Sequence, residues 1–180
     1  MHPRTLEVLA YLDEQRAALK TALDDMPPSL RAERPAPGRW SAAEVLEHLV
    51  LVETRIGKLL EGHLAKAREA GLAPEHETTP ILPSFDAPAM LDRTRTFTAS
   101  TASIPQGAMD AGAAWDALQT EREDLKALIL SADGLALGDI QIPNSRFGTL
   151  NFYQWVLFLG AHERRHAAQI EEVMAKLTMD

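Results

Sequence analysis

Three histidines are the residues in this sequence whose type and spacing could do chemistry. His162 and His166 are four positions apart, so on a helix their imidazoles lie on one face, one turn from each other. Apolar residues share that face, and His48 lies in an apolar stripe of its own. Three inward imidazoles would offer a divalent ion three nitrogen ligands and leave coordination positions open for water or a substrate.

A structural role is the alternative for each of these histidines. A single inward histidine is more often a hydrogen-bonded core residue than a metal ligand. Three together favour a metal, because burying three imidazoles without a shared partner leaves several polar nitrogens unsatisfied. His63 continues the stripe of His48 towards the end of its helix, where a cation suits the helix dipole, so we expect a structural role there.

Residues 162–166 also match the His-Glu-x-x-His pattern of zinc metalloproteases. Such proteases take a third ligand from further along the chain, but no Gly-x-x-His follows His166 and only 14 residues remain. Glu163 is nevertheless a candidate catalytic base, because it directly follows a candidate ligand. One residue along a helix turns a side chain by about 100°, so an interhelical or surface salt bridge is the favoured alternative for Glu163.

Four helices are expected to position these residues. Apolar residues recur at helical spacing at about 3–26, 42–70, 109–130 and 150–177, and a capping box of Ser41 and Glu44 starts the second stretch. The connection at about 72–107 holds five of the 11 prolines and is predicted to be irregular, apart from a short helix near 87–94. We predict no strands. The pattern indicates an all-α fold, a four-helix bundle.

Composition limits the classes of partner. The chain has 180 residues, which indicates one domain over 1–180, and a net charge of −8, which excludes nucleic acid or an anionic membrane as the main partner. No cysteine is present, so any metal must bind histidine or carboxylate. The longest apolar run, residues 155–160, is too short to cross a bilayer. We therefore expect a cytoplasmic protein that acts on a small-molecule substrate.

Two segments carry a family resemblance. Residues 40–49 read Trp-Ser-x-x-Glu-x-Leu-x-His-Leu, and residues 147–151 read Phe-Gly-x-Leu-Asn. Residues 162–170 then read His-Glu-x-x-His-x-x-Gln-Ile. In this order and at this separation, the segments resemble the signatures of the DinB-like (DinB/YfiT) superfamily. The resemblance implies a DinB/YfiT-like four-helix bundle, often a homodimer, with one divalent metal ion held by His48, His162 and His166.

The resemblance also suggests an activity, since characterised members are similar to thiol-dependent transferases and isomerases. The first hypothesis is a metal-dependent thiol S-transferase that acts on a small electrophile, with Ni²⁺ or Zn²⁺ as the metal. Because the chain has no cysteine, its thiol would be a low-molecular-weight cosubstrate. The second hypothesis is a metal-dependent hydrolase with Glu163 as its base. The third is a non-enzymatic, metal-stabilised binding or assembly module.

Overall fold

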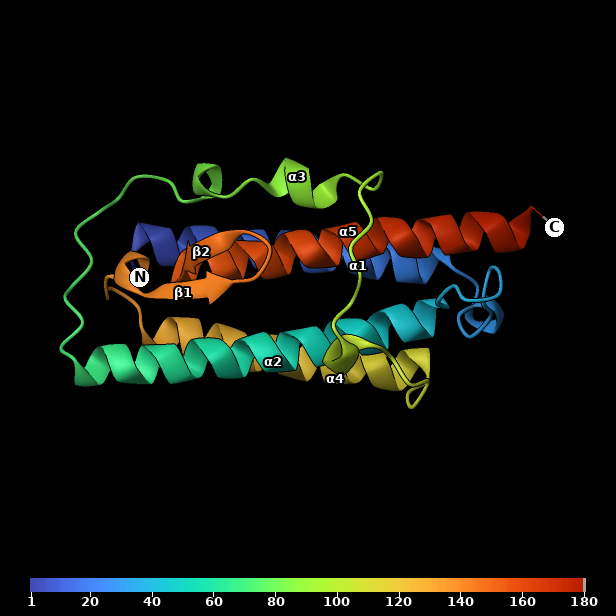
Figure 1. The fold of residues 1–180 in the computed structure, drawn as a ribbon, viewed down its shortest axis with the longest axis horizontal. Coiled ribbons are helices and arrows are strands. Elements are labelled where there is room, and N and C mark those ends of the chain that lie inside the picture. Colours follow the sequence, from blue (N-terminus) through green and yellow to red (C-terminus); the bar gives the residue numbers. More distant parts are fainter. Residues whose placement is uncertain (180) are drawn as a thin grey trace.

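The computed structural model describes residues 1–179, in which four long helices form a bundle (Figure 1). These helices are α1 (Pro3–Asp25), α2 (Ala42–Glu69), α4 (Ala111–Ser131) and α5 (Phe152–Thr178). Their ends lie within two residues of the predicted stretches, and the all-α four-helix bundle is confirmed. Within residues 1–179, none of the helices has the length and apolar character needed to cross a membrane.

The order of the helices explains the long connection between α2 and α4. α1 packs along α5 and runs in the same direction, whereas α2 packs along α4 and both run the opposite way (Figure 1). Because α2 and α4 are parallel, the chain between them must return along the whole bundle. It does so over α5, where the short helix α3 (Ala87–Leu91) packs. We call residues 70–110 the crossover segment.

Capping boxes set the starts of the two helices that carry the histidines. At α2, the Ser41 hydroxyl accepts from the Glu44 amide at 3.2 Å and the Glu44 carboxylate accepts from the Ser41 amide at 2.9 Å, as predicted. At α5, Asn151 and Gln154 make the same two bonds, each 2.9 Å long. Each box satisfies amide groups that the first turn leaves free, which fixes where the helix begins.

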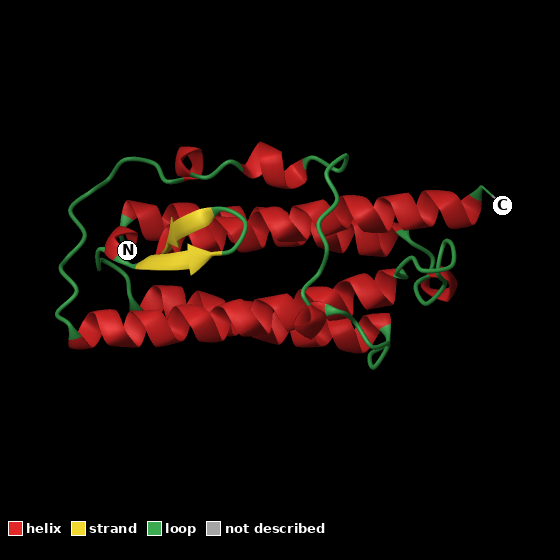
Figure 2. Cartoon of the chain, viewed as in Figure 1, coloured by secondary structure: helices red, strands yellow, loops and turns green. Residues whose placement is uncertain are grey.

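The prediction that the chain has no strands was wrong. Strands β1 (Gln141–Asn144) and β2 (Gly148–Asn151) form an antiparallel hairpin before α5 (Figure 2). Gly148 has φ +75° directly after the three-residue loop, a common geometry for such hairpins. Each strand has only four residues, too few for apolar alternation to stand out. The hairpin also explains why α5 starts at Phe152 rather than at about Leu150.

A layer of buried charges divides the apolar core in two. One apolar cluster contains Leu12 of α1 and Ile56 of α2, whereas the other contains Leu19 of α1 and Leu49 of α2. Between the clusters each long helix contributes one buried charged side chain. We call these four residues the charge layer: Arg16, Glu53, Arg122 and Glu163.

Candidate metal centre

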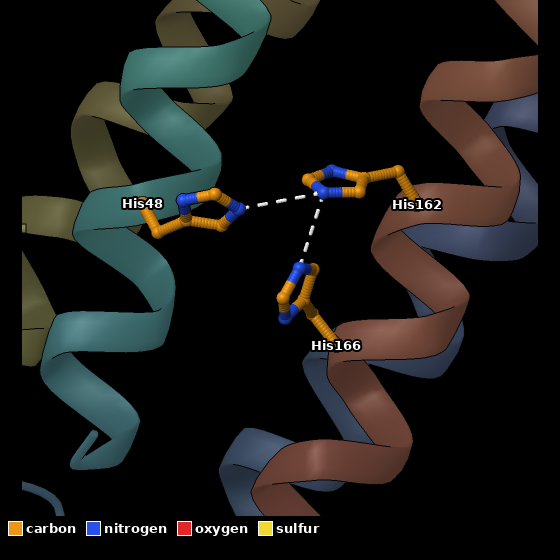
Figure 3. Close-up of side chains that lie close together, drawn as sticks. All are labelled: His48, His162 and His166. Atoms are coloured by element: carbon orange, nitrogen blue, oxygen red, sulfur yellow. Dashed lines mark hydrogen bonds between the residues drawn. The ribbon is translucent and has the colours of Figure 1, made fainter. Parts of the chain in front are cut away.

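Three imidazoles from two helices meet beside the charge layer. His48 projects from α2 and His162 and His166 project from α5, one turn apart, so that the rings face one another (Figure 3). The Nε2 atom of His162 lies 3.4 Å from that of His48 and 3.1 Å from that of His166. All three side chains are buried. The structure thus brings together the three residues that the sequence singled out as metal ligands.

The outer nitrogens of two of these rings have fixed partners. His48 Nδ1 lies 2.6 Å from the carbonyl oxygen of Ser103, and His166 Nδ1 lies 2.9 Å from the amide oxygen of Gln169. Both partners only accept hydrogen bonds, so each Nδ1 carries the hydrogen and donates it. The Nε2 atom of each ring therefore presents a lone pair to the centre of the cluster, the tautomer that a metal-binding histidine needs.

The nitrogen contacts within the cluster fit a metal ion better than they fit hydrogen bonds alone. The Nε2 of His162 can donate at most one hydrogen, yet it faces the lone pairs of both His48 and His166. A cation between the three nitrogens would turn this repulsion into attraction. Ligands at the usual Zn–N distance in a tetrahedral site lie about 3.3 Å apart, close to the two contacts seen here. All three ligand atoms lie within 4.8 Å of one another.

The protonation of the cluster also suits a cation. Burial lowers the pKa of His48, and it lowers the pKa values of His162 and His166 well below 6.5. The neighbouring imidazoles lower the pKa of His162 further, because like charges disfavour one another. The rings are therefore neutral at pH 7, which is the form that binds a metal.

A cavity of about 540 Å³ opens onto the histidines. α2, α5, the loop of the β hairpin and residues 38–40 before α2 form part of its wall, and the crossover segment contributes through residues 90–103. Arg165 of α5 holds that segment in place, because its guanidinium donates to the carbonyls of Met90, Asp92 and Arg95. The irregular connection is thus a wall of the site, which its composition did not reveal.

Comparison with known proteins agrees with the fold and the cluster. The family model of the DinB superfamily matches residues 11–170, which include all three histidines. The chain belongs to the DinB superfamily. It is also similar to YuaE of Bacillus subtilis (strain 168), a protein described as uncharacterized, at 28% identity over 153 residues that cover 81% of this chain and 83% of YuaE. Family membership makes the three-histidine cluster compatible with a divalent metal ion.

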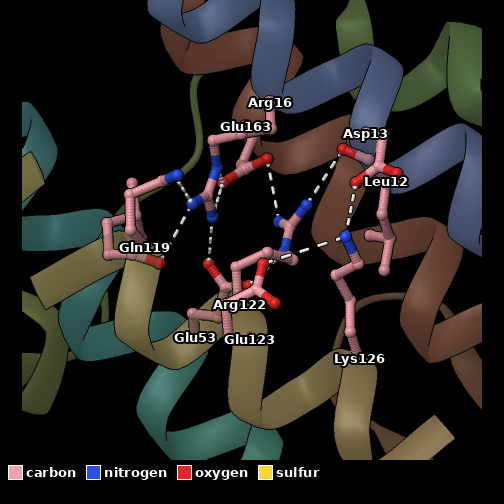
Figure 4. Close-up of polar contacts among 10 residues, drawn as sticks. Leu12, Asp13, Arg16, Glu53, Gln119, Arg122, Glu123, Lys126 and Glu163 are labelled. Carbon is pink, nitrogen blue, oxygen red and sulfur yellow. Dashed lines mark hydrogen bonds and ion pairs between the residues drawn. The ribbon is translucent and has the colours of Figure 1, made fainter. Parts of the chain in front are cut away.

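The structure does not bring Glu163 to the histidines of this DinB superfamily protein. Glu163 Oε1 lies 2.6 Å from Arg16 Nη2, and Glu163 Oε2 lies 2.9 Å from Arg122 Nη2 as an ion pair (Figure 4). Glu53 contacts the same two arginines, at 3.0 and 2.7 Å. Glu163 thus occupies the charge layer between the helices, on a different face of α5 from His162 and His166.

Aromatic side chains form the apolar part of the site. Phe158 stacks on His162 with ring centroids 5.7 Å apart and an interplanar angle of 15°, and Trp40 packs against His48 at 5.0 Å. Trp155 and Phe158 line the cavity, whereas Phe152 is fully buried in the core. Sequence reasoning gave Trp155, Phe158 and Phe152 no substrate role, because helical spacing of large apolar residues is equally typical of a core.

Two polar residues received no role at the site from the sequence, although Gln169 is part of the signature of residues 162–170. Gln169 lies three positions after His166, a spacing at which helical side chains meet, so its contact was available from the pattern. Ser103 could not be found in this way, because its backbone carbonyl makes the contact and its position depends on the path of the crossover segment.

Proposed function

We propose that this protein is a divalent-metal-dependent transferase that joins the sulfur of a low-molecular-weight thiol to a small electrophile. The observation that carries the proposal is that three neutral imidazole nitrogens line a cavity of about 540 Å³. Small-molecule sites typically measure 300–1,000 Å³. A structural metal site would be closed by a fourth protein ligand, whereas a catalytic site keeps a position open.

The histidines and their partners have defined tasks in this proposal. His48, His162 and His166 would hold the ion, with Ser103 and Gln169 fixing the ring orientations through Nδ1. A divalent ion bound by three neutral ligands keeps its charge and lowers the pKa of a thiol that reaches it. Trp155 and Phe158 give the cavity an apolar wall against which an electrophile can pack.

The reaction balances without an oxidant or reductant. With an epoxide as the electrophile, a sulfur–carbon bond forms, the ring carbon–oxygen bond breaks, and the thiol proton ends on the released oxygen. The sulfur comes from the cosubstrate, because the chain contains no cysteine. Glu163 takes no part in this step, since both of its oxygens contact arginines of the charge layer.

The proposal is tested by turnover with defined metals and substrates. Untagged protein loaded with zinc or nickel is mixed with glutathione or 2-mercaptoethanol and styrene oxide, and loss of free thiol and formation of the conjugate are followed by absorbance and mass spectrometry. We expect metal-dependent conjugation that His48→Gln abolishes. The matched control is His63→Gln, which removes an imidazole from the same helix outside the cluster.

The possible outcomes distinguish the transferase from the binding module and from the hydrolase. Equal turnover in His48→Gln and the unchanged protein would contradict the role of the cluster. Metal binding without any thiol consumption would favour a binding module. Hydrolysis of an ester without added thiol would favour the hydrolase.

A further inference from the structure

Positive charge is concentrated around the cavity of an acidic protein. The chain has a net charge of −8 and 13 arginines. Five of those arginines line the cavity, and Glu172 is the single carboxylate among the lining residues. This distribution is opposite to that of the chain as a whole. The lining arginines are Arg39, Arg55, Arg93, Arg146 and Arg165.

Two of these arginines are already occupied by the protein. Arg93 forms a two-point ion pair with Glu172, with nitrogen–oxygen distances of 2.9 and 2.7 Å. Arg165 is buried, and its guanidinium donates to three carbonyl oxygens of the crossover segment. Both therefore have roles in holding the cavity wall.

Arg55 and Arg146 have only neutral partners within residues 1–179. Arg55 Nη1 donates to the hydroxyls of Ser100 and Ser103, at 2.9 and 3.0 Å. Arg146 donates through Nη2 to the carbonyl of Thr98 and lies over the ring of Phe97. These contacts orient both guanidinium groups but neutralise neither, and each keeps further N–H donors for a ligand.

The two arginines are linked to the histidine cluster. Ser103, whose hydroxyl accepts from Arg55, also accepts from His48 through its carbonyl oxygen. Arg146 lines the same cavity as His48 and His162. Both guanidinium groups and the imidazoles thus face one cavity.

A divalent cation at the histidines would increase this concentration of positive charge. The neutral imidazoles carry no negative charge to balance this positive charge, and the carboxylate of Glu172 is already paired with Arg93. Like charges at close range disfavour one another unless an anion lies between them. Arginine is also well suited to bind carboxylate or phosphate through two parallel hydrogen bonds.

We infer that Arg55 and Arg146 form an oxyanion subsite, so that the molecule bound in this cavity carries a carboxylate or phosphate group. The inference rests on the proposed function for the location of the substrate, and it adds the chemical class. In the proposed transfer, the subsite would hold the charged end of the thiol or of the electrophile while the reacting atom faces the histidines.

Calorimetric titration of zinc-loaded protein tests the subsite. Succinate and inorganic phosphate are titrated separately, with succinamide as the neutral counterpart of succinate. We expect one of the two anions to bind and succinamide to show no binding. Arg55→Gln and Arg146→Gln should each weaken the anion about tenfold, the effect of losing a hydrogen bond to a charged group. Whether succinate or phosphate binds more tightly identifies the class of oxyanion.

Arg164→Gln is the matched control. Arg164 lies on α5 directly before Arg165, but it is exposed and outside the cavity, so its loss should change affinity less than twofold. Arg55 and Arg146 are themselves exposed, and unchanged melting temperatures would show that their variants are folded. Equal weakening in all three variants would overturn the inference, because it would show a general charge effect. Anion affinity that neither cavity variant alters would also overturn it.

The outcomes keep this inference distinct from the proposed function. Oxyanion binding that depends on Arg55 and Arg146, without thiol turnover, would support the subsite and contradict the transferase. Turnover of the neutral thiol 2-mercaptoethanol, without binding of either anion, would support the transferase and overturn the subsite.

Discussion

Glu163→Gln separates a structural role from a catalytic one. The substitution keeps the shape of the side chain and removes its charge. Glu163 is 2% exposed, and its oxygens lie 2.6 Å from Arg16 and 2.9 Å from Arg122. The variant leaves two buried guanidinium groups opposite a single carboxylate, that of Glu53.

The expected loss of stability follows from this geometry. Removing one partner of a buried ion pair costs about 3–5 kcal/mol, because the remaining charge is left uncompensated. Arg16 and Arg122 retain Glu53, so we expect a value near the lower end, about 3 kcal/mol. For a chain of this size, that loss corresponds to a fall in melting temperature of about 6–12 °C.

Urea unfolding followed by circular dichroism measures this loss directly. The slope of the free energy of unfolding against urea should stay unchanged, since the same surface is exposed on unfolding. Asp24→Asn is the matched control, because it removes a carboxylate from the exposed pair Lys20–Asp24, and such pairs contribute at most about 1 kcal/mol. Unchanged stability of Glu163→Gln together with lost turnover would refute the structural role and support a catalytic base.

Three further predictions rest on the site and the packing, and a fourth rests on the family resemblance. Chelation should lower the melting temperature of the unchanged protein and of His63→Gln, because a metal ion that binds only the folded state stabilises it by mass action. The melting temperature of His48→Gln should not change. A full response in His48→Gln would contradict the assignment of His48 as a metal ligand. Without metal, the free energy of unfolding should fall as the pH drops below about 6.5. The reason is that the histidines bind protons in the unfolded chain, whereas burial lowers their pKa values and keeps them neutral in the folded protein. The pH profile of His48→Gln should be flatter, because one of these histidines is missing. Gly160→Ala should lower the melting temperature, since a Cβ there would lie 2.4 Å from the ring of Tyr11 and force α1 and α5 apart. Light scattering should give twice the monomer mass, as the family resemblance implies, and a monomer at all concentrations would contradict this.

The sequence predicted what depends on helical periodicity and local capping. The four helices, the capping box of Ser41 and Glu44, and the inward faces of His48, His162 and His166 follow from spacing along single helices. Apolar stripes on the helices are long enough to distinguish a period of 3.6 from other patterns.

Features that depend on the path of irregular chain could not be predicted. The hairpin strands are too short to show a period, and the crossover segment reaches the cavity only because α2 and α4 are parallel. The sequence placed Glu163 away from the ligands but could not identify Arg16 and Arg122 as its partners, since this requires the relative rotation of three helices.

Metal analysis of the protein tests the central claim most directly. Protein prepared without a histidine tag is incubated with zinc or nickel, freed of excess ion by gel filtration, and measured by elemental analysis beside His48→Gln and His63→Gln. The three-histidine centre predicts close to one divalent ion per chain in the unchanged protein and in His63→Gln, and a large loss in His48→Gln. Absence of bound metal from the unchanged protein, or equal metal content in His48→Gln, would contradict the account.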